Sequence, residues 1–191
     1  LMDAASDVGS LQIRNNGTIG GNIGNASPAG DLLPVLYLYD AKIEIMGPEG
    51  IRMAGIDEVL AGPGRMTLAY NEAITRILLP PCSYTTSFVK LGSRKKVTIS
   101  RIGVALGVEM EKDHVKDIRL YIGAVSVKPL HLTAAEDFIR GKVLNELNIL
   151  DMAQILSDYV KENVAVEFDR DYKVYAAKGA VMDAFLRLKR D

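Results

Sequence analysis

The sequence contains a single cysteine, Cys82, only two histidines and no tryptophan. One cysteine excludes a disulfide within the chain, and also an iron–sulfur cluster or zinc site whose cysteine ligands come from this chain alone. With only His114 and His131 besides, we expect no metal site. No apolar run is long enough to span a bilayer, and a net charge of −1 gives no overall attraction to nucleic acid or to an anionic membrane. These absences favour a cytoplasmic protein with neither a nucleic-acid nor a membrane partner.

The rest of the composition is that of a globular protein. The chain has 191 residues, of which 48% are hydrophobic and 25% charged. This is enough for one or two compact domains with a buried core.

The most unusual stretch is residues 14–31, which read RNNGTIGGNIGNASPAGD. Glycine and asparagine favour turns and left-handed backbone, so this density predicts a loop and neither a helix nor a strand. A glycine-rich loop lets peptide N–H groups approach a phosphate closely, because no Cβ stands in the way. We therefore predict a ligand-binding loop, with a plain surface turn as the alternative. The adjacent glycines Gly20 and Gly21 distinguish it from the GxGxxG dinucleotide fingerprint.

A short helix is expected directly after this loop. Apolar residues recur at helical spacing over residues 32–38, and Pro34 falls in the first turn, where its missing N–H costs little. Asp31 precedes them and suits the N-cap position, since its carboxylate accepts hydrogen bonds from backbone N–H groups.

Alternating patterns and turn residues organise the rest of the first half. They predict a hairpin, a short helix and a strand, at residues 41–46 with 51–54, 56–61, and 73–79. Pro80-Pro81 stops the last strand and is the best domain boundary in the chain, dividing it into residues 1–80 and 83–191.

The second half is predicted to be a small antiparallel sheet followed by helices. The strands are expected at residues 85–91, 99–110 and 115–127, and the helices at 134–140, capped by Thr133, at 149–163 and at 172–190. On the last helix, one stripe is expected to face the core: Tyr172, Tyr175, Val181, Phe185 and Leu188.

These motifs resemble those of a known family. QIRNNGTIGGNIGNASPAGDLLPVL is similar to the second flavin-binding loop of the FAD subunit of molybdenum-containing hydroxylases, and the resemblance continues through SFVKLGSRKKVTISRIGVAL to the last helix. It implies an α+β fold. Residues 1–80 would be the second FAD-binding subdomain, the remainder of a PCMH-type FAD-binding domain. Residues 83–191 would resemble the C-terminal domain of the carbon monoxide dehydrogenase flavoprotein.

The resemblance also implies the cofactor-binding residues, and no catalytic side chain. The diphosphate or ribityl region of FAD would be held by Thr18, Ile19, Gly20, Gly21 and Asn22. Asp31 would accept a hydrogen bond from a cofactor hydroxyl, Ile74 would pack against the isoalloxazine ring, and Lys90 would lie near the ring, where its ammonium favours the anionic reduced flavin. Helix capping remains the alternative for Asp31, and an ordinary core position the alternative for Ile74.

The function implied by the resemblance is electron transfer. Iron–sulfur clusters on one partner subunit and molybdopterin on another would deliver electrons to FAD, which passes them to NAD or another acceptor. Arg94, Lys95 and Lys96 would suit the NAD diphosphate, with a solvated turn as the alternative. The chain is expected to lack the family's N-terminal FAD subdomain, to be inactive in isolation, and to resemble most the xanthine dehydrogenase type. The alternatives are a flavin-free docking module for the two partner subunits and a different flavoprotein fold that reuses a glycine-rich loop.

Overall fold

The computed structural model describes residues 1–94, 97–164 and 169–188. Its helices are α1 (Met2–Ser6), α2 (Leu11–Asn16), α3 (Ile19–Gly24), α4 (Leu33–Leu38), α5 (Ile56–Val59), α6 (Thr133–Ile139), α7 (Glu146–Asn163) and α8 (Arg170–Leu188). Its strands are β1 (Lys42–Gly47), β2 (Gly50–Gly55), β3 (Leu60–Gly62), β4 (Arg65–Met66), β5 (Ala73–Leu78), β6 (Thr85–Gly92), β7 (Ser100–Glu111), β8 (His114–Gly123) and β9 (Leu130–His131). Every strand pair in these ranges is antiparallel.

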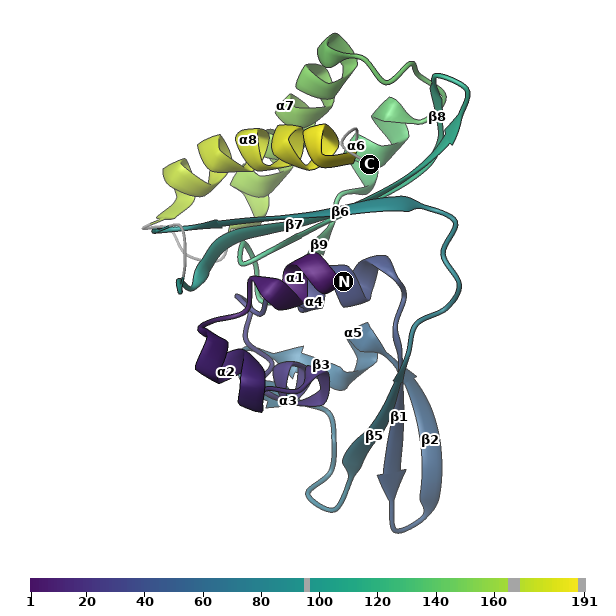
Figure 1. Cartoon of the computed structure of the whole chain (residues 1–191), viewed down its shortest axis with the longest axis vertical. Helices are drawn as coiled ribbons and strands as arrows, with labels where there is room; N and C mark the ends of the chain where they lie inside the picture. Colours follow the sequence, from purple (N-terminus) through teal and green to yellow (C-terminus); the bar gives the residue numbers. More distant parts are fainter. Residues whose placement is uncertain (95–96, 165–168, 189–191) are drawn as a thin grey trace.

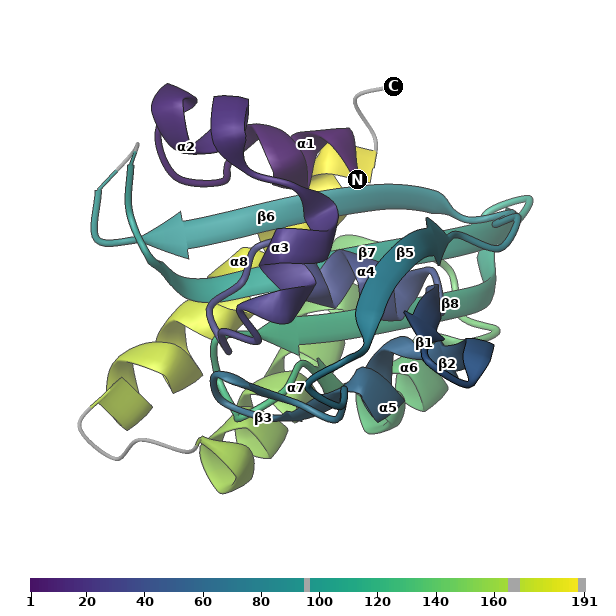
Figure 2. The same ribbon diagram turned by 90° about the horizontal axis from the view of Figure 1, so that it is seen from below.

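The larger sheet, in the order β6-β7-β8-β9, forms the middle layer of the molecule. Helices α6 and α8 contact one of its faces, with α7 packed on both of them, while α1 and α4 contact the other face (Figures 1 and 2). Both faces are therefore buried. In β6, Phe88 joins the core on the α4 side, and its neighbour Val89 joins the core on the α8 side. This is the alternation that a pleated strand imposes.

Helix α4 lies close against this sheet because glycines face it. A Cβ added at Gly123 would lie 2.6 Å from Cγ of Pro34, and one added at Gly107 would lie 3.3 Å from Cδ1 of Leu38. Both glycines thus make room for the helix where larger side chains would hold it off. The backbone adds a further link, since the N–H of Ala124 donates to the carbonyl of Pro28 at 2.9 Å.

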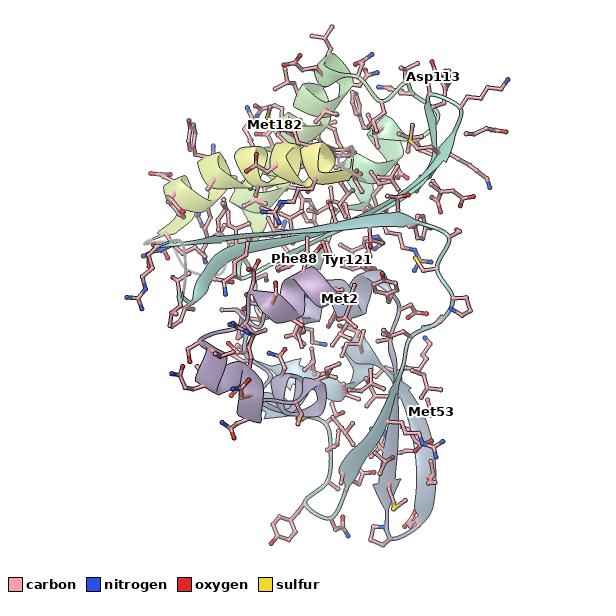
Figure 3. All side chains as sticks on the ribbon, viewed as in Figure 1. Met2, Met53, Phe88, Asp113, Tyr121 and Met182 are labelled. Carbon is pink, nitrogen blue, oxygen red and sulfur yellow. The ribbon has the colours of Figure 1, made fainter. Side chains whose placement is uncertain are left out.

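The smaller sheet, in the order β2-β1-β5, extends away from the larger one and carries the predicted hairpin (Figure 1). Ile43 and Ile45 of β1 are fully buried, whereas Met46 on the same strand and Met53 of β2 are 47% and 51% exposed. Figure 3 shows Met53 on this projecting sheet, far from Phe88 and Tyr121 beside the larger sheet. The sheet thus has one face in the core and one open to solvent.

Most predicted elements of the second half are confirmed, and the differences have local causes. Helix α7 begins before residue 149 because the side chain of Asn145 accepts a hydrogen bond from the N–H of Asn148 at 2.9 Å. Thr133 does not cap α6 but lies inside it. The predicted core-facing stripe on α8 is wrong at its first two residues, since Tyr172 and Tyr175 are 43% and 82% exposed.

Two further differences lie in the first half. The predicted helix over residues 56–61 stops at Val59, and the chain continues as strand β3. The predicted loop over residues 14–31 is wrong as well, because it contains the end of α2 and all of α3. The second of these differences reshapes the predicted ligand site.

Candidate functional site

The glycine-rich motif forms the short helix α3 in spite of its three glycines. Thr18 is its N-cap, and the Thr18 hydroxyl accepts a hydrogen bond from the N–H of Gly21 at 2.8 Å. Ile23 anchors the helix from inside the core, with none of its surface exposed. A cap and one buried anchor therefore outweigh the low helix propensity of glycine.

The capped helix leaves fewer backbone amides open than a loop would. The N–H of Gly21 is bonded to the Thr18 side chain, and the N–H of Asn22 donates to the Thr18 carbonyl at 2.9 Å. The amides of Ile19 and Gly20 belong to the first turn and have no acceptor within the helix. Two of the four predicted anion-binding amides are thus already engaged in this structure.

A cleft of about 580 Å³ lies against this helix. Thr18, Ile19, Gly21 and Asn22 line it, together with Arg14 and apolar residues such as Val8 and Leu32. We call it the α3 cleft. The Oδ1 atom of Asn22 is buried and has no hydrogen-bond partner among the described residues. This oxygen lies inside the fold, where a Cβ added at Gly30 would approach it to 3.4 Å, so it is not open to the cleft.

Asp31 and Lys90 meet in a buried ion pair. The Lys90 ammonium donates to Oδ2 of Asp31 at 2.7 Å, and each side chain is only 8% exposed. The same ammonium donates to the carbonyl of Asp7 at 2.8 Å, which ties the end of α1 to strand β6. Ser100, at the start of β7, donates its hydroxyl to Oδ1 of Asp31. We call Asp31, Lys90 and Ser100 the carboxylate cluster.

The expected N-cap role of Asp31 is wrong. Helix α4 has Leu32 as its N-cap and no side-chain cap bond. Were Asp31 the cap, its carboxylate would accept hydrogen bonds from the backbone N–H groups of Leu33 and of residue 34, but residue 34 is a proline without an N–H. The N–H of Leu33 instead donates to the carbonyl of Gly30 at 3.2 Å. The carboxylate is therefore free to take partners from β6 and β7.

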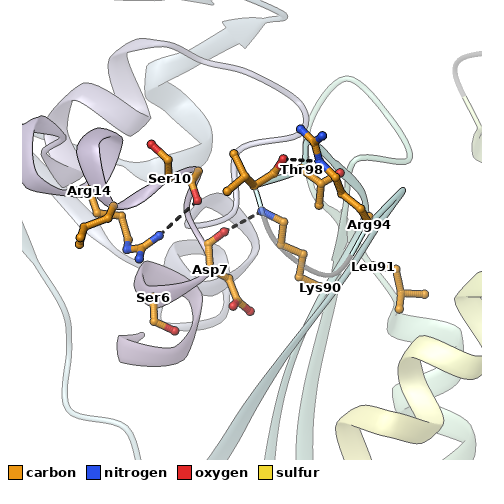
Figure 4. Close-up of a pocket in the computed structure, with 12 residues that line it drawn as sticks. Ser6, Asp7, Ser10, Arg14, Lys90, Leu91, Arg94 and Thr98 are labelled. Carbon is orange, nitrogen blue, oxygen red and sulfur yellow. Dashed lines mark hydrogen bonds between the residues drawn. The ribbon is translucent and has the colours of Figure 1, made fainter.

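A second cleft, of about 890 Å³, opens beside the carboxylate cluster (Figure 4). It lies between the α1–α2 segment and the end of β6, and Arg14, Lys90 and Arg94 line it. Among the described lining residues only Asp7 is acidic. We call this the basic cleft. Arg14 borders both clefts and donates to the carbonyls of Val8 and Gly9 at 3.0 and 3.2 Å. The excess of cations favours an anionic ligand.

The structure does not bring all predicted residues together. Ile74 lies in β5, paired with Ile45, half-buried against the core and outside the lining of both clefts. Gly20 lies beside the α3 cleft but does not line it. In the predicted cation run, Arg94 donates to the carbonyl of Val97 at 2.8 Å, while Lys95 and Lys96 lie outside the described residues.

Two polar residues of this region, Ser100 and Arg14, were not predicted as site residues from the sequence. Arg14 stands directly before the glycine-rich motif and carries a cation, a signal that the sequence contains. Ser100 stands 69 residues from its partner Asp31 in a stretch of strand character, and no local pattern identifies it.

A separate polar cluster joins α4, α5 and the loop between β8 and β9. Tyr37 donates to Oδ1 of Asp57 at 2.8 Å, and Lys128 donates to the same oxygen at 3.1 Å. Burial, and then the bond to Asp57, raise the pKa of Tyr37. Burial acts to raise the pKa of Asp57, but the hydrogen bonds from Tyr37 and Lys128 outweigh it and hold that pKa below its ordinary value. These groups satisfy one another, and their arrangement indicates a structural contact.

Two features are absent from the parts of the chain that the structure describes. No group of three or more histidine, cysteine, aspartate or glutamate side chains is placed there to hold a metal ion. None of the helices there combines the length and apolarity needed to cross a bilayer.

The sequence matches two family models. Residues 1–82 match the FAD binding domain in molybdopterin dehydrogenase, and residues 87–188 match the CO dehydrogenase flavoprotein C-terminal domain. The xanthine dehydrogenase FAD-binding subunit of Escherichia coli O157:H7 is 31% identical over 168 residues, which cover 86% of this chain and 56% of that protein. The nicotinate dehydrogenase FAD-subunit of Eubacterium barkeri is 31% identical over 192 residues, covering 97% and 65%.

Solved structures share the fold. Carbon monoxide dehydrogenase from Hydrogenophaga pseudoflava superposes with a TM-score of 0.83 at 27% identity, over 96% of this chain and 64% of that one. Quinoline 2-oxidoreductase from Pseudomonas putida 86 superposes with a TM-score of 0.89 at 22% identity, over 97% and 65%. The chain thus spans 56% and 65% of the length of the two subunits named above. The α+β fold predicted from the sequence is confirmed, and the chain belongs to the family of FAD-binding medium subunits of molybdenum-containing hydroxylases.

Proposed function

We propose that this chain binds FAD and acts as the electron-transfer subunit of a molybdenum-containing hydroxylase. The observation that carries the proposal is the α3 cleft, which is lined by Thr18, Ile19, Gly21 and Asn22 of the TIGGN motif and by Arg14. It lies in a segment that matches a FAD-binding family model over residues 1–82. Within this proposal, residues 1–80 are the second FAD-binding subdomain and residues 83–191 the C-terminal flavoprotein domain.

The residues present fit a dinucleotide of this kind. Thr18 to Asn22 would hold the diphosphate or ribityl region, with the two open amides of Ile19 and Gly20 as hydrogen-bonding groups. Asp31 lines neither cleft, but each of its carboxylate oxygens uses one lone pair within the carboxylate cluster and retains another that a cofactor hydroxyl would reach. Ile74 would supply an apolar contact from β5.

When bound, FAD would accept electrons in pairs or singly and pass them on. The chain's own task is to bind, orient and tune the cofactor. Lys90 keeps its ammonium in place by bonds to Asp31 and to the Asp7 carbonyl. A cation fixed in a nearly buried position stabilises nearby negative charge more than one in water. With its ammonium nearer the cofactor than the Asp31 carboxylate that offsets its charge, Lys90 would favour the reduced state of the cofactor.

The partners and the electron acceptor follow from the same proposal. An iron–sulfur subunit and a molybdopterin-binding subunit would supply the electrons, and the chain alone would turn over no substrate. NAD is the proposed acceptor, supported by the cations of the basic cleft. A xanthine dehydrogenase-like complex is the proposed setting, supported by the 31% identity with the Escherichia coli subunit. Relatives named for nicotinate and glyceraldehyde are similar at 31% and 29% identity, so the substrate is best assigned through the molybdenum subunit.

The test is a visible absorbance spectrum of the purified chain. It is recorded alone, with added FAD, and with FAD plus a separately made segment that carries the family's first FAD-binding loop. Bound flavin without that segment would mean that the TIGGN half of the site suffices. Bound flavin only in its presence would mean that two segments share the site.

Absence of bound flavin in every mixture would refute the proposal. A chain that still captured the iron–sulfur and molybdopterin subunits would then be the flavin-free docking module.

A further inference from the structure

We propose that Ser100 is a positioning residue for the cofactor site, acting through Asp31 and Lys90. The inference rests on the proposed FAD binding and extends it to a residue in neither the TIGGN motif nor the lining of either cleft. Its basis is the carboxylate cluster, in which Ser100 holds one oxygen of Asp31 and Lys90 the other.

The cluster connects segments that are distant in sequence. Asp31 lies in the turn before α4, Lys90 in β6 and Ser100 at the start of β7, and Lys90 reaches on to the carbonyl of Asp7 after α1. Ser100 pairs with Gly92 across the β6–β7 ladder, next to a register irregularity. The irregularity brings Ser100 to the strand end where Lys90 also points toward Asp31.

Ser100 determines how the carboxylate is oriented. The terminal torsion of an aspartate is broad and nearly two-fold, so a carboxylate held by one oxygen can rotate. Donors on both oxygens remove this freedom. Since the Lys90 ammonium is held by the same carboxylate, fixing Asp31 also fixes the position of the cation beside the basic cleft.

The carboxylate cluster is nearly buried, so the loss of one of its hydrogen bonds is costly. Ser100 is 7% exposed and Asp31 is 8% exposed, so water has little access to replace a lost donor. Loss of a hydrogen bond to a buried charged group is among the more costly single changes. The Ser100 hydroxyl therefore affects both how firmly a cofactor hydroxyl is met by Asp31 and where positive charge stands near the cofactor.

The test compares FAD affinity and flavin midpoint potential in Ser100→Ala, Ser100→Thr and Ser87→Ala. Ser87 is a matched control, because it is 8% exposed and its hydroxyl donates to the carbonyl of Ala184 at 2.8 Å, on the α8 side of the sheet. Affinity is measured by quenching of FAD fluorescence, and potential by spectroelectrochemistry at saturating FAD. Urea unfolding checks that each variant is folded at the assay temperature.

We expect Ser100→Ala to weaken FAD binding roughly fivefold or more, and to lower the midpoint potential because the ammonium is less well fixed. Ser100→Thr, which keeps the hydroxyl on a strand-favouring side chain, restores both values. Ser87→Ala changes stability but neither value. Unchanged affinity and potential in Ser100→Ala overturn the inference, as does a loss of affinity that leaves the potential unchanged and that Thr does not restore. A wild-type chain that binds no FAD refutes the proposed function itself.

Discussion

Gly21 is the position where a single methyl group tests the proposed ligand contact most directly. It lies in the first turn of α3 and lines the α3 cleft, and a Cβ added there would lie 3.1 Å from Oγ1 of Thr18. That separation is tighter than an ordinary contact, so the Thr18 hydroxyl must give way by a few tenths of an ångström. In Gly21→Ala the methyl group therefore both narrows the cleft and strains the helix cap.

Gly21→Ala has two opposing effects on the free energy of unfolding, and they nearly cancel. Alanine lowers the conformational entropy of the unfolded chain, which stabilises by about 0.4–1 kcal/mol where the backbone is compatible. Loss of an N-cap bond costs about 1 kcal/mol. We thus expect the free energy of unfolding to change by less than about 1 kcal/mol, measured by urea denaturation. FAD affinity should fall at least tenfold, about 1.4 kcal/mol, because the backbone can no longer be approached closely.

Gly24→Ala is the matched control in the same helix. A Cβ there would meet only Sδ of Met66, at an ordinary 3.7 Å, and Gly24 does not line the α3 cleft. This variant should be as stable as the wild type or more so, with unchanged FAD affinity. The larger Gly21→Val should abolish binding. Wild-type affinity in Gly21→Ala, measured by fluorescence quenching, would show that no ligand approaches this turn and would refute the site.

Three other expectations follow from individual contacts. Replacing Lys90 by Met should destabilise the fold by about 3–5 kcal/mol in urea denaturation, because Asp31 is left as a buried charge without its cation; a loss below 1 kcal/mol would contradict the pairing. Hydrogen bonds from Arg52 and from the Ala69 N–H lower the pKa of Glu72 to about 2. The ionised Glu72 therefore stabilises the fold above its ordinary pKa of 4.5, and this contribution is lost as pH falls toward 2. A carboxyl NMR titration should give a pKa of about 2 for Glu72, and Arg52→Gln should raise that pKa. On α8, Phe185→Ala should cost about 3–5 kcal/mol while Tyr175→Ser stays within about 0.5 kcal/mol, and equal losses would contradict the observed burial.

Elements set by neighbouring residues were predictable from the sequence. The β1–β2 hairpin follows from alternation around a Gly-Pro-Glu-Gly turn, and the β7–β8 hairpin from β-branched runs around a polar turn. In both, the pairing partners are close in sequence, so the local pattern contains nearly all of the information. Boundaries shifted by a few residues where a cap such as Asn145 was not recognised.

Helix α3 was not predicted because composition and tertiary structure point in opposite directions. Its glycines favour a turn, but Thr18 caps the helix and Ile23 is buried against segments that come much later in the chain. The cap was readable as a threonine three residues before Gly21, whereas the burial of Ile23 was not. On α8 the buried stripe runs at helical spacing through Ala177, Val181 and Phe185, and Tyr172 and Tyr175 lie off this stripe.

Asp31 was wrongly predicted to cap α4, and its contacts with Lys90 and Ser100 were not predicted. The sequence already contained the reason that it cannot cap a helix well here, since Pro34 removes the N–H three residues after Asp31. A carboxylate that is nearly buried and has no amide to bond is stabilised by pairing with a cation. The partners that meet this need, Lys90 and Ser100, lie 59 and 69 residues away. The sequence thus contains the reason that Asp31 is a poor cap, whereas its burial and its partners are determined only by the folded sheet.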